Sequence, residues 1–383
     1  MRKIPAQELE RIGTKLLDAA GSPHEESRLV TEMLVRSSLM GHDSHGVLRF
    51  VEYVNHMQAG QLEPGGPFEV IEDNPCFAIA DGHRSWGLLT ARKAMELAMN
   101  KARQHGTGTV VIRNSPHIGR LGEYPVMAAS SAMIGLVMVN SYGSQDMVAP
   151  WGGINPRLSA NPISWAAPTG NEWPFMVDIT TSVVPEGKVR VALHAGKQLP
   201  EGCLIDHEGN PTTDPAALYG PKAGAILPLG GIVGHKGYGL NLVIELLAGV
   251  LSGAGCRGQK KTHTGNGVFL QAIDIAHFIP VEQFVSSVQE MITHVKSSRK
   301  APGVEEILIP GELEYRTQKT RSAEAGMPCD QSQRSSGLGR ILKYFSRTNR
   351  ARGSRLFSFS TDMTSPSPLQ TMRKKQGIEG EGA

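Results

Sequence analysis

Residues 88–122 have the sequence LLTARKAMELAMNKARQHGTGTVVIRNSPHIGRLG, and this stretch decides the fold class. The first half, Leu88–Gln104, is predicted to form a helix, and Thr109–Ile112 follows it as a short apolar strand. Further strand-like runs lie at Cys76–Ala80, Gly135–Asn140 and Phe175–Ile179. Strands that alternate with helices indicate an α/β protein.

The N-terminal region is predicted to be helical. Residues 6–40 form two expected helices, broken at Gly21-Ser22-Pro23. Gly41 is expected to end the second helix, and Ser44 to cap a third helix that runs from about His45 to Met57. Residues 6–57 are therefore expected to supply helices that can cover the strands.

Composition and charge exclude several classes of protein. A chain of 383 residues with 40% hydrophobic content can bury a large core, and its length suggests more than one domain. Residues 331–383 carry ten Lys/Arg against three Asp/Glu, a formal charge of +7, whereas the residues before them carry −4. The body has no basic stripe interleaved with aromatic residues, so no nucleic-acid partner is expected.

The cysteine spacing and the N-terminal sequence predict the cellular compartment of the protein. The four cysteines are scattered without a CxxC pair, which favours free thiols in a reducing compartment. The first residues resemble an amphipathic helix and lack the apolar core of a signal peptide. The longest apolar helix candidate, Tyr238–Leu251, contains Asn241 and Glu245 and is too short to span a bilayer. We expect a cytoplasmic protein without a membrane partner.

The chain changes character after about residue 330. Residues 331–383 are rich in Ser, Arg and Gly and lack sustained periodicity, so this atypical tail is predicted to be largely disordered.

One glycine motif is rejected as a nucleotide site. Gly253-Ala-Gly255-Cys-Arg-Gly258 matches G-x-G-x-x-G, but a dinucleotide fingerprint needs a strand before it and a helix after it. Here a predicted helix precedes the motif and a polar run follows it, so a Rossmann site is not expected at this position.

The first candidate site is Gly41-His42-Asp43-Ser44-His45-Gly46, which continues to Arg49. In a helix capped by Ser44, His45 and Arg49 would share one face. A guanidinium can bind the carboxylate of a 2-oxo acid with two hydrogen bonds, and a histidine can give a proton to its carbonyl oxygen near neutral pH. The alternative is a turn histidine and a surface arginine without a catalytic role.

The second candidate is His117, in the glycine-containing loop Asn114–Gly122 that follows the strand Thr109–Ile112. Loops at strand ends often carry catalytic residues. The alternative is a loop histidine with a purely structural role.

Two further segments are suited to binding phosphate or ribose. Gly234-His235-Lys236-Gly237 opens the apolar helix, where free N–H groups, the helix dipole and Lys236 form an anion site. Asp178-Ile179-Thr180-Thr181-Ser182 is a strand end that runs into hydroxyl residues, which can bind a ligand or merely cap a helix. No HExxH motif or His/Cys cluster with ligand spacing occurs, so no metal site is predicted.

At these four places the sequence resembles the malate/L-lactate dehydrogenase family that is distinct from the Rossmann lactate dehydrogenases. The resemblance covers about residues 5–330 and includes several more segments. These are Ala149–Gly153, Asn161-Pro162-Ile163, Gly187–Val191, Gly209–Thr213 and Pro310-Gly311-Glu312. It departs from the family pattern at Pro116 and at SYGSQDM (residues 141–147), and it ends near Asp330.

The resemblance implies a fold and an activity. The fold would be α/β and non-Rossmann, like that of sulfolactate dehydrogenase, with a largely antiparallel central sheet and surrounding helices. Residues 1–118 with 288–330 would form the helical, substrate-binding and dimerisation part, and residues 119–287 the nucleotide-binding part. The protein would transfer a hydride between NAD(P)H and a small 2-oxo or 2-hydroxy acid, with NAD or NADP as cofactor, as a homodimer.

The resemblance also implies roles for individual residues. His45 matches the family's proton donor, with His117 as a competing candidate, and Ser44 and Arg49 match its substrate-binding residues. The segments that match the family's nucleotide site contain Asp178, Ile179, Thr180, Thr181, Ser182, His235, Lys236, Gly311 and Glu312. Two alternatives stay open: an imine (cyclic imino acid) reductase of the same family, and a catalytically impaired relative that acts as a binding protein.

Overall fold

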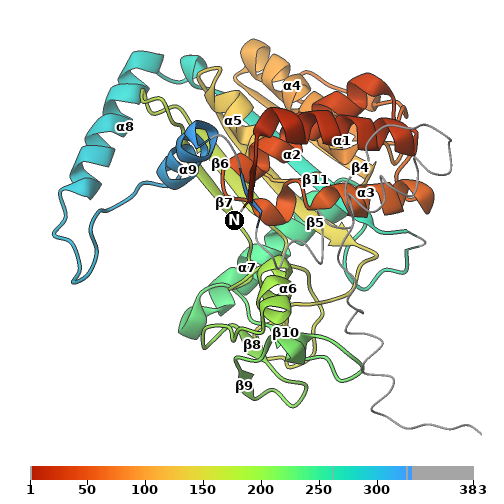
Figure 1. The fold of residues 1–383 in the computed structure, drawn as a ribbon. Helices are drawn as coiled ribbons and strands as arrows, with labels where there is room; N and C mark the ends of the chain where they lie inside the picture. The colour runs from red at the N-terminus through yellow and green to blue at the C-terminus, as the bar shows by residue number, and fades with distance from the viewer. Residues whose placement is uncertain (1, 262, 325–326, 330–383) are drawn as a thin grey trace, which may run out of the picture. The chain divides into compact units, whose positions relative to one another are not determined.

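A seven-stranded sheet is the centre of the computed structural model, which describes residues 2–261, 263–324 and 327–329 (Figure 1). Its strand order is β2-β3-β4-β11-β5-β6-β7. Only β3 and β4 run parallel, and every other neighbouring pair in this sheet is antiparallel. The strands are β2 (Glu69–Asp73), β3 (Phe77–Asp81), β4 (Thr107–Ser115), β11 (Gly265–Asp274), β5 (Met133–Tyr142), β6 (Ile163–Ala167) and β7 (Phe175–Ile179). The expected α/β fold with a largely antiparallel sheet is confirmed.

Helices cover both faces of this sheet. On one face, α4 (Gly87–His105) packs on β4 and β11, and α5 (Glu123–Ala129) packs on β5 and β6. On the other face, Ile244 and Ala248 pack with strand residues such as Val111. Because side chains alternate along a strand, the equally buried neighbours of Val111 point to the α4 face. Burial on both faces explains why the predicted strands are continuous apolar runs.

The N-terminal helices form as the sequence predicts. Helix α1 (Ala6–Ala20) ends at Gly21, which adopts φ +106° and returns its N–H to the carbonyl of Asp18. Helix α2 (His24–Leu39) then begins after Pro23, and α1 packs on both α2 and α3 (Arg49–Gln58). The predicted break at residues 21–23 is therefore confirmed.

The predicted helix from His45 to Met57 is wrong at its start. Asp43–His45 is a single 3₁₀ turn, Gly46 leaves the helical region, and α3 begins only at Arg49. The Ser44 hydroxyl does not cap a helix, because it bonds the ring of His45 instead. The backbone N–H of Val47 is bound by the Ser38 hydroxyl of α2, and this contact holds residues 44–47 out of the helix.

A smaller region is built around the three-stranded sheet β10-β8-β9 (Figure 1). Its own core contains Val148, Val189, Leu204 and Ile226. Helix α6 (Glu186–Ala195) contributes Val189 to this core. The strands are β8 (Leu204–Ile205), β9 (Pro211–Thr212) and β10 (Ala225–Ile226).

The apolar helix predicted at Tyr238–Leu251 is divided in two. Helix α7 (His235–Ile244) continues directly into a π-helix, Glu245–Val250. The G-x-G-x-x-G match at Gly253–Gly258 follows this helix and precedes strand β11, so it lacks the strand–helix context of a dinucleotide site. Strand β11, the central partner of β4 and β5, was not predicted.

The C-terminal part of the described chain adds two helices and a short strand. Helices α8 (Val281–Lys296) and α9 (Glu312–Ala323) follow β11, and β12 (Met327–Cys329) pairs with β1 (Arg2–Ile4). The prediction for residues 331–383 lies outside the described residues. The predicted division at residue 118 stays a prediction; one sheet runs through both of its parts, since β4 pairs with β11.

Candidate active site

The first part of the site is the turn that carries Ser44 and His45. The Ser44 hydroxyl lies 3.1 Å from His45 Nδ1, and the Ser44 carbonyl accepts a 2.8 Å hydrogen bond from Arg49 Nε. Helix α6 begins beside this turn, because a Cβ on Gly187 would lie only 3.3 Å from Ser44 Cβ. A glycine at position 187 thus allows the smaller region to approach the His45 turn closely.

The second part is the loop after β4 that carries His117. His117 Nδ1 lies 2.8 Å from the Tyr53 hydroxyl and accepts a 3.3 Å hydrogen bond from the Gly119 N–H. The start of α4 packs directly on this loop, because a Cβ on Gly87 would lie 2.4 Å from the Pro116 carbonyl oxygen. Tyr53 comes from α3 one turn after Arg49, so α3 supplies groups to both parts of the site.

The fold brings the two predicted histidines together. The rings of His45 and His117 stack with centroids 5.5 Å apart and planes 20° apart. Burial, followed by the charge on Arg49, lowers the pKa of His45 to about 3 and the pKa of His117 well below its usual value. Both rings are therefore neutral at pH 7 in this structure, and the positive charges of Arg49 and Arg120 act on His45.

The arginine predicted to bind a carboxylate lies beside these rings. Arg49 Nη1 contacts both Glu52 carboxylate oxygens at 2.6 Å, while its side chain is only 15% exposed. No described residue accepts a hydrogen bond from Arg49 Nη2. One donor nitrogen therefore stays available for a ligand.

Arg120 is a second arginine at the site, and the sequence analysis did not assign it a role. It is 4% exposed, donates to Glu123 through Nη2 at 3.2 Å, and has no partner for Nε among the described residues. Its charge also contributes to the lowered pKa of His45. Arg120 thus strengthens the positive potential around the two histidines.

The predicted nucleotide segment at the end of β7 adjoins the His117 loop. The Gly122 N–H donates to Asp178 Oδ2 at 2.7 Å, which connects the two segments directly. Ile179 is exposed, and the hydroxyl of Ser182 bonds to Thr180 Oγ1 and to the Val184 carbonyl. Thr181 is fully buried, and its hydroxyl donates to the Ala160 carbonyl and accepts from Asn241 Nδ2. In this structure Thr181 therefore supports the backbone of the segment.

His235 and Lys236 lie at the start of α7 and are exposed. No side chain caps this helix start, so its first N–H groups are free of a side-chain acceptor in the described chain. Asn241, farther along α7, donates to Thr181 Oγ1 at 2.8 Å and thereby ties the helix to the β7 segment. Two of the three predicted nucleotide segments are therefore adjacent.

Gly311 and Glu312 lie at the other end of β7. The Met176 N–H donates to the Pro310 carbonyl at 3.1 Å, next to Gly311. Glu312 is buried, accepts the Ile309 N–H at 2.8 Å and pairs with Lys296 at 2.6 Å. The strand β7 thus connects the Gly311–Glu312 segment to Asp178.

A buried polar network supports this arrangement and was missed by sequence reasoning. Glu245, in the π-helix, accepts from Asn161 Nδ2 at 2.8 Å and from Asn140 Nδ2 at 3.2 Å. Asn161 also donates to Asn241 at 2.8 Å. The signal present in the sequence was a pair of polar residues, Asn241 and Glu245, inside an apolar helix, which indicates buried hydrogen bonding.

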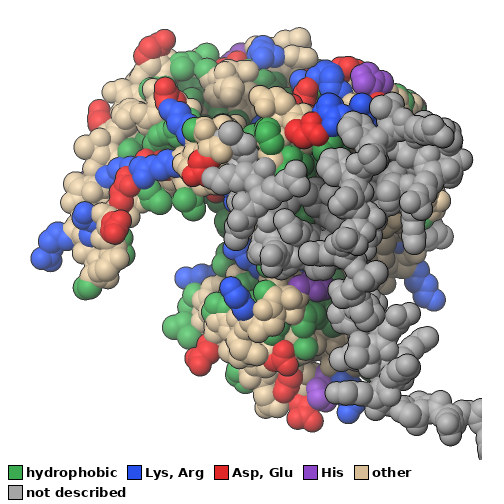
Figure 2. Space-filling view, in the orientation of Figure 1, with side chains coloured by type: hydrophobic (Ala, Val, Ile, Leu, Met, Phe, Trp, Pro, Cys, Tyr) green, Lys and Arg blue, Asp and Glu red, His purple; other side chains and the backbone are tan. Residues whose placement is uncertain are grey.

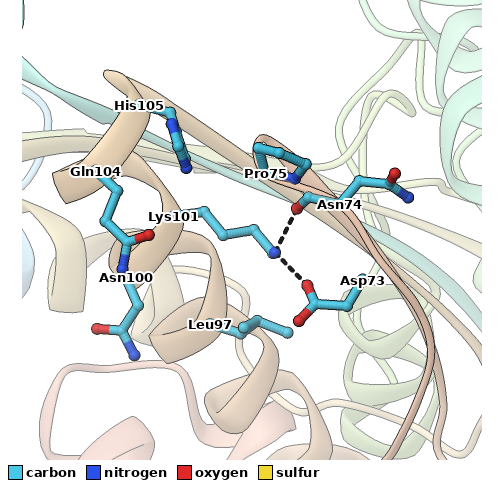
Figure 3. Close-up of a pocket in the computed structure, with 8 residues that line it drawn as sticks. All are labelled: Asp73, Asn74, Pro75, Leu97, Asn100, Lys101, Gln104 and His105. Atoms are coloured by element: carbon cyan, nitrogen blue, oxygen red, sulfur yellow. Dashed lines mark hydrogen bonds and ion pairs between the residues drawn. The ribbon is translucent and has the colours of Figure 1, made fainter.

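A separate pocket of about 400 Å³ lies between the end of β2 and α4 (Figure 3). Lys101 points into it but is already held by Asp73 and by the Asn74 carbonyl at 2.6 Å. None of the predicted site residues lines this pocket. It is therefore not part of the histidine site.

The residues that the structure describes contain neither a metal-ligand cluster nor a membrane-spanning helix. No group of three or more His, Cys, Asp and Glu side chains lies in an arrangement that could hold a metal ion. In the same residues, no helix has the length and apolar character needed to cross a membrane.

Comparisons with known proteins agree with one another. A family model described as malate/L-lactate dehydrogenase matches residues 4–336. A malate dehydrogenase of Pyrococcus horikoshii is 41% identical over 334 residues, which cover 85% of this chain and 91% of that relative. Hydroxycarboxylate dehydrogenase B of Escherichia coli (strain K12) is 32% identical over 332 residues, covering 86% and 90%. The solved sulfolactate dehydrogenase of Methanocaldococcus jannaschii superposes with a TM-score of 0.79 at 33% identity, covering 90% of this chain and 98% of that one.

Proposed function

Because this chain belongs to the malate/L-lactate dehydrogenase family, we propose that it transfers a hydride between NAD(P)H and a small 2-oxo or 2-hydroxy acid. The observation that carries the proposal is the stacked pair His45–His117 beside Arg49. This group combines two proton-handling side chains with a guanidinium, which is what reduction of a 2-oxo acid requires.

The substrate carboxylate would bind Arg49 and the hydroxyl of Ser44. Arg49 is largely buried, so its charge is weakly screened, and Arg120 adds a second positive charge nearby. The bound acid would place its 2-oxo group against the histidine pair. Exclusion of water from this pocket strengthens each of these interactions.

The cofactor would be held by the three segments along β7 and α7. The free N–H groups at the start of α7 and the exposed Lys236 suit a phosphate group, which supports this placement. A bound nicotinamide would supply or receive the hydride. The binding residues in this proposal are Asp178, Ile179, Thr180, Thr181, Ser182, His235, Lys236, Gly311 and Glu312.

The test is nicotinamide-dependent absorbance change with a panel of 2-oxo acids, using NADH and NADPH in parallel. Turnover of at least one 2-oxo acid supports the proposal. A cyclic imino acid belongs in the same panel, since turnover of that compound alone would identify an imine reductase. Binding of cofactor without any turnover would instead favour a catalytically impaired binding protein.

We also infer a homodimer, and the apolar surface of α7 and the π-helix supports it. On these helices Leu246 is 59% exposed, Val250 52% and Val243 42%. An exposed apolar helix face of this kind is typical of an interaction surface. Figure 2 shows hydrophobic side chains at the margin of the smaller region, where this helix lies in Figure 1.

Light scattering after gel filtration tests the dimer. Leu246→Asp should shift the mass from two chains towards one, because a charge would be buried in the interface. The matched control is Ile71→Asp on β2, which is also exposed and should leave the mass unchanged. A wild-type protein with the mass of a single chain would contradict the inference.

The remaining parts of the proposal concern organisation and location. We propose that residues 1–118 with 288–330 serve substrate binding and residues 119–287 nucleotide binding. The resemblance implies that dimerisation belongs to the first part, whereas the dimer contact proposed above, on α7 and the π-helix, would lie in the second. The scattered cysteines favour a cytoplasmic location.

A further inference from the structure

The two histidines of the site differ in what binds Nδ1. His117 Nδ1 faces the Gly119 N–H at 3.3 Å and the Tyr53 hydroxyl at 2.8 Å, whereas His45 Nδ1 faces only the Ser44 hydroxyl at 3.1 Å. No described residue forms a hydrogen bond to Nε2 of either ring. The protonation of each ring is thus governed from its Nδ1 side.

A backbone N–H can only donate a hydrogen bond, so the 3.3 Å contact with Gly119 favours a lone pair on His117 Nδ1. This long contact is weak, and the Tyr53 hydroxyl, at 2.8 Å, is the closer partner of the same nitrogen. A proton donated by Tyr53 to Nδ1 would keep the ring proton of neutral His117 on Nε2. Protonation of Nδ1 would break the Gly119 hydrogen bond and force the Tyr53 hydroxyl to accept instead.

Tyr53 is held rigidly in this donor position. It is 2% exposed, and its ring meets Trp86 edge-on at 78° with centroids 5.5 Å apart. Trp86 is itself fixed by a 3.0 Å hydrogen bond from its indole nitrogen to the Ser22 hydroxyl. Burial raises the pKa of Tyr53, so its hydroxyl keeps the proton that it donates.

The partner of His45 imposes no such restriction. A serine hydroxyl can both donate and accept, so Ser44 can bind His45 Nδ1 in either protonation state. His45 can therefore alternate between imidazolium and neutral imidazole without losing its partner.

We propose that Tyr53 is a positioning residue that keeps His117 as a neutral Nε2–H donor, so that His45 alone transfers the proton. This inference rests on the proposed function, since it divides the chemistry of 2-oxo acid reduction between the two rings. Both Nε2 atoms would address the oxygen of the 2-oxo group, His117 as a fixed donor and His45 as the acid.

The proton count of the step is balanced. A bound NAD(P)H would supply the hydride that bonds to C2. The C2–O double bond would then become a single bond, and its oxygen would take the Nε2 proton of the His45 imidazolium. His45 is left neutral, with its remaining proton on Nδ1 and donated to Ser44 Oγ. His117 begins and ends the step neutral, and the reverse reaction returns the proton to His45.

A bound substrate carboxylate would raise the pKa of His45. Without a ligand, burial and then the charge on Arg49 lower the pKa of this ring. A carboxylate bound to Arg49 would place a negative charge beside the ring, which offsets the second of these causes and favours the imidazolium.

The decisive experiment reads the tautomer of His117 by ¹⁵N NMR of the full chain labelled at histidine. The resonance is assigned by comparison with His117→Asn. In the wild type at pH 7, Nδ1 should be unprotonated and Nε2 protonated. In Tyr53→Phe, which keeps the ring but removes the donor, the two tautomers should mix. Tyr219→Phe is the control, because it removes a partly buried hydroxyl that donates to Glu186 and bonds neither a histidine nor the His117 loop; it should keep the wild-type pattern.

Kinetics provide the second measurement. Tyr53→Phe should lower kcat about tenfold with little change in cofactor affinity, the loss of one oriented hydrogen bond in the transition state. A wild-type His117 protonated on Nδ1, or an unchanged tautomer in Tyr53→Phe, would overturn the inference. Because the NMR experiment needs no substrate, it judges the role of Tyr53 even if no 2-oxo acid is turned over.

Discussion

The His45 turn and the His117 loop place the same side chain in opposite surroundings. His117 is bound by a backbone N–H and a buried tyrosine that packs on Trp86. His45 stands on a single 3₁₀ turn, next to a serine hydroxyl and several charged groups. A histidine that gains and loses a proton needs a partner, such as a serine hydroxyl, that can both donate and accept a hydrogen bond. A histidine that stays neutral and only donates from Nε2 is better held by partners that donate to its Nδ1.

The two regions also differ in their contacts with helix α9, which binds the His45 turn through charged side chains. Arg321 pairs with Asp43 at 2.9 Å and also bonds the Ser38 carbonyl, while Glu314 lies 3.7 Å from His42 Nε2. Charged side chains of α9 therefore hold the His45 turn from outside. The same helix begins at Gly311 and Glu312, so it connects a predicted cofactor segment to the proposed proton donor.

The largest expected effect separates the two histidines directly. His45→Asn should lower kcat by about 10²–10⁴, the usual contribution of a positioned general acid, with cofactor affinity nearly unchanged. Steady-state kinetics and cofactor titration measure the two quantities. The comparison variant is His117→Asn, for which a smaller loss is expected, because a neutral hydrogen-bond donor is removed and not the acid. A large loss for His117→Asn with almost none for His45→Asn would reverse the assignment.

Arg49→Lys should have the next largest effect and concerns substrate binding. Arg49 uses Nε to bind the Ser44 carbonyl and Nη1 to bind Glu52, which leaves Nη2 for the substrate. A single ammonium nitrogen cannot make these three contacts at once, so KM for the 2-oxo acid should rise about 10- to 100-fold, the worth of a charged hydrogen bond. Arg92→Lys is a suitable control, since Arg92 pairs with Glu96 on the exposed surface of α4. Equal KM and kcat for Arg49→Lys and wild type across several 2-oxo acids would show that Arg49 does not bind the carboxylate.

Much of the sheet could be predicted because its strands are apolar runs. Phe175–Ile179 was predicted with the bounds that the structure has, and Thr109–Ile112 lies inside β4. Strand β11 was not predicted, because it begins with Gly265-Asn266-Gly267, which continues the polar run before it. Its pairing with β4 and β5 is a long-range interaction that local sequence does not reveal.

Some of the site residues could also be predicted from local sequence patterns, and others could not. His45, His117 and Arg49 lie in short polar motifs between apolar segments, so their chemistry was visible in the sequence. Tyr53 was not, because at one helical turn after Arg49 it is indistinguishable from a core aromatic residue. Ser44 was expected to cap a helix, and only the contact between Val47 and Ser38 of α2 explains why it does not.

The smallest expected effect tests the charged contacts that hold the His45 turn. The ring of His42, 3.7 Å away, lowers the pKa of Glu314 below its usual value, although burial acts in the opposite direction. A carboxyl group whose folded pKa is lower than its unfolded pKa stabilises the fold while it is ionised. This contribution is complete above the unfolded value of about 4.3 and is lost as the pH falls through the lower folded value. Glu314→Gln should therefore reduce Tm by about 1–3 °C at pH 7, the shift expected for roughly 1 kcal/mol, and the difference from wild type should shrink at acidic pH. Thermal melts of both proteins in a pH series measure this difference in Tm.

Glu306→Gln is the matched control, because Glu306 pairs with Arg316 on the outer surface of α9 and does not contact the turn. A kcat that falls in Glu314→Gln but not in Glu306→Gln would show that α9 positions the His45 turn for catalysis. Equal melting curves for Glu314→Gln and wild type at every pH would mean that this contact contributes nothing to holding the turn.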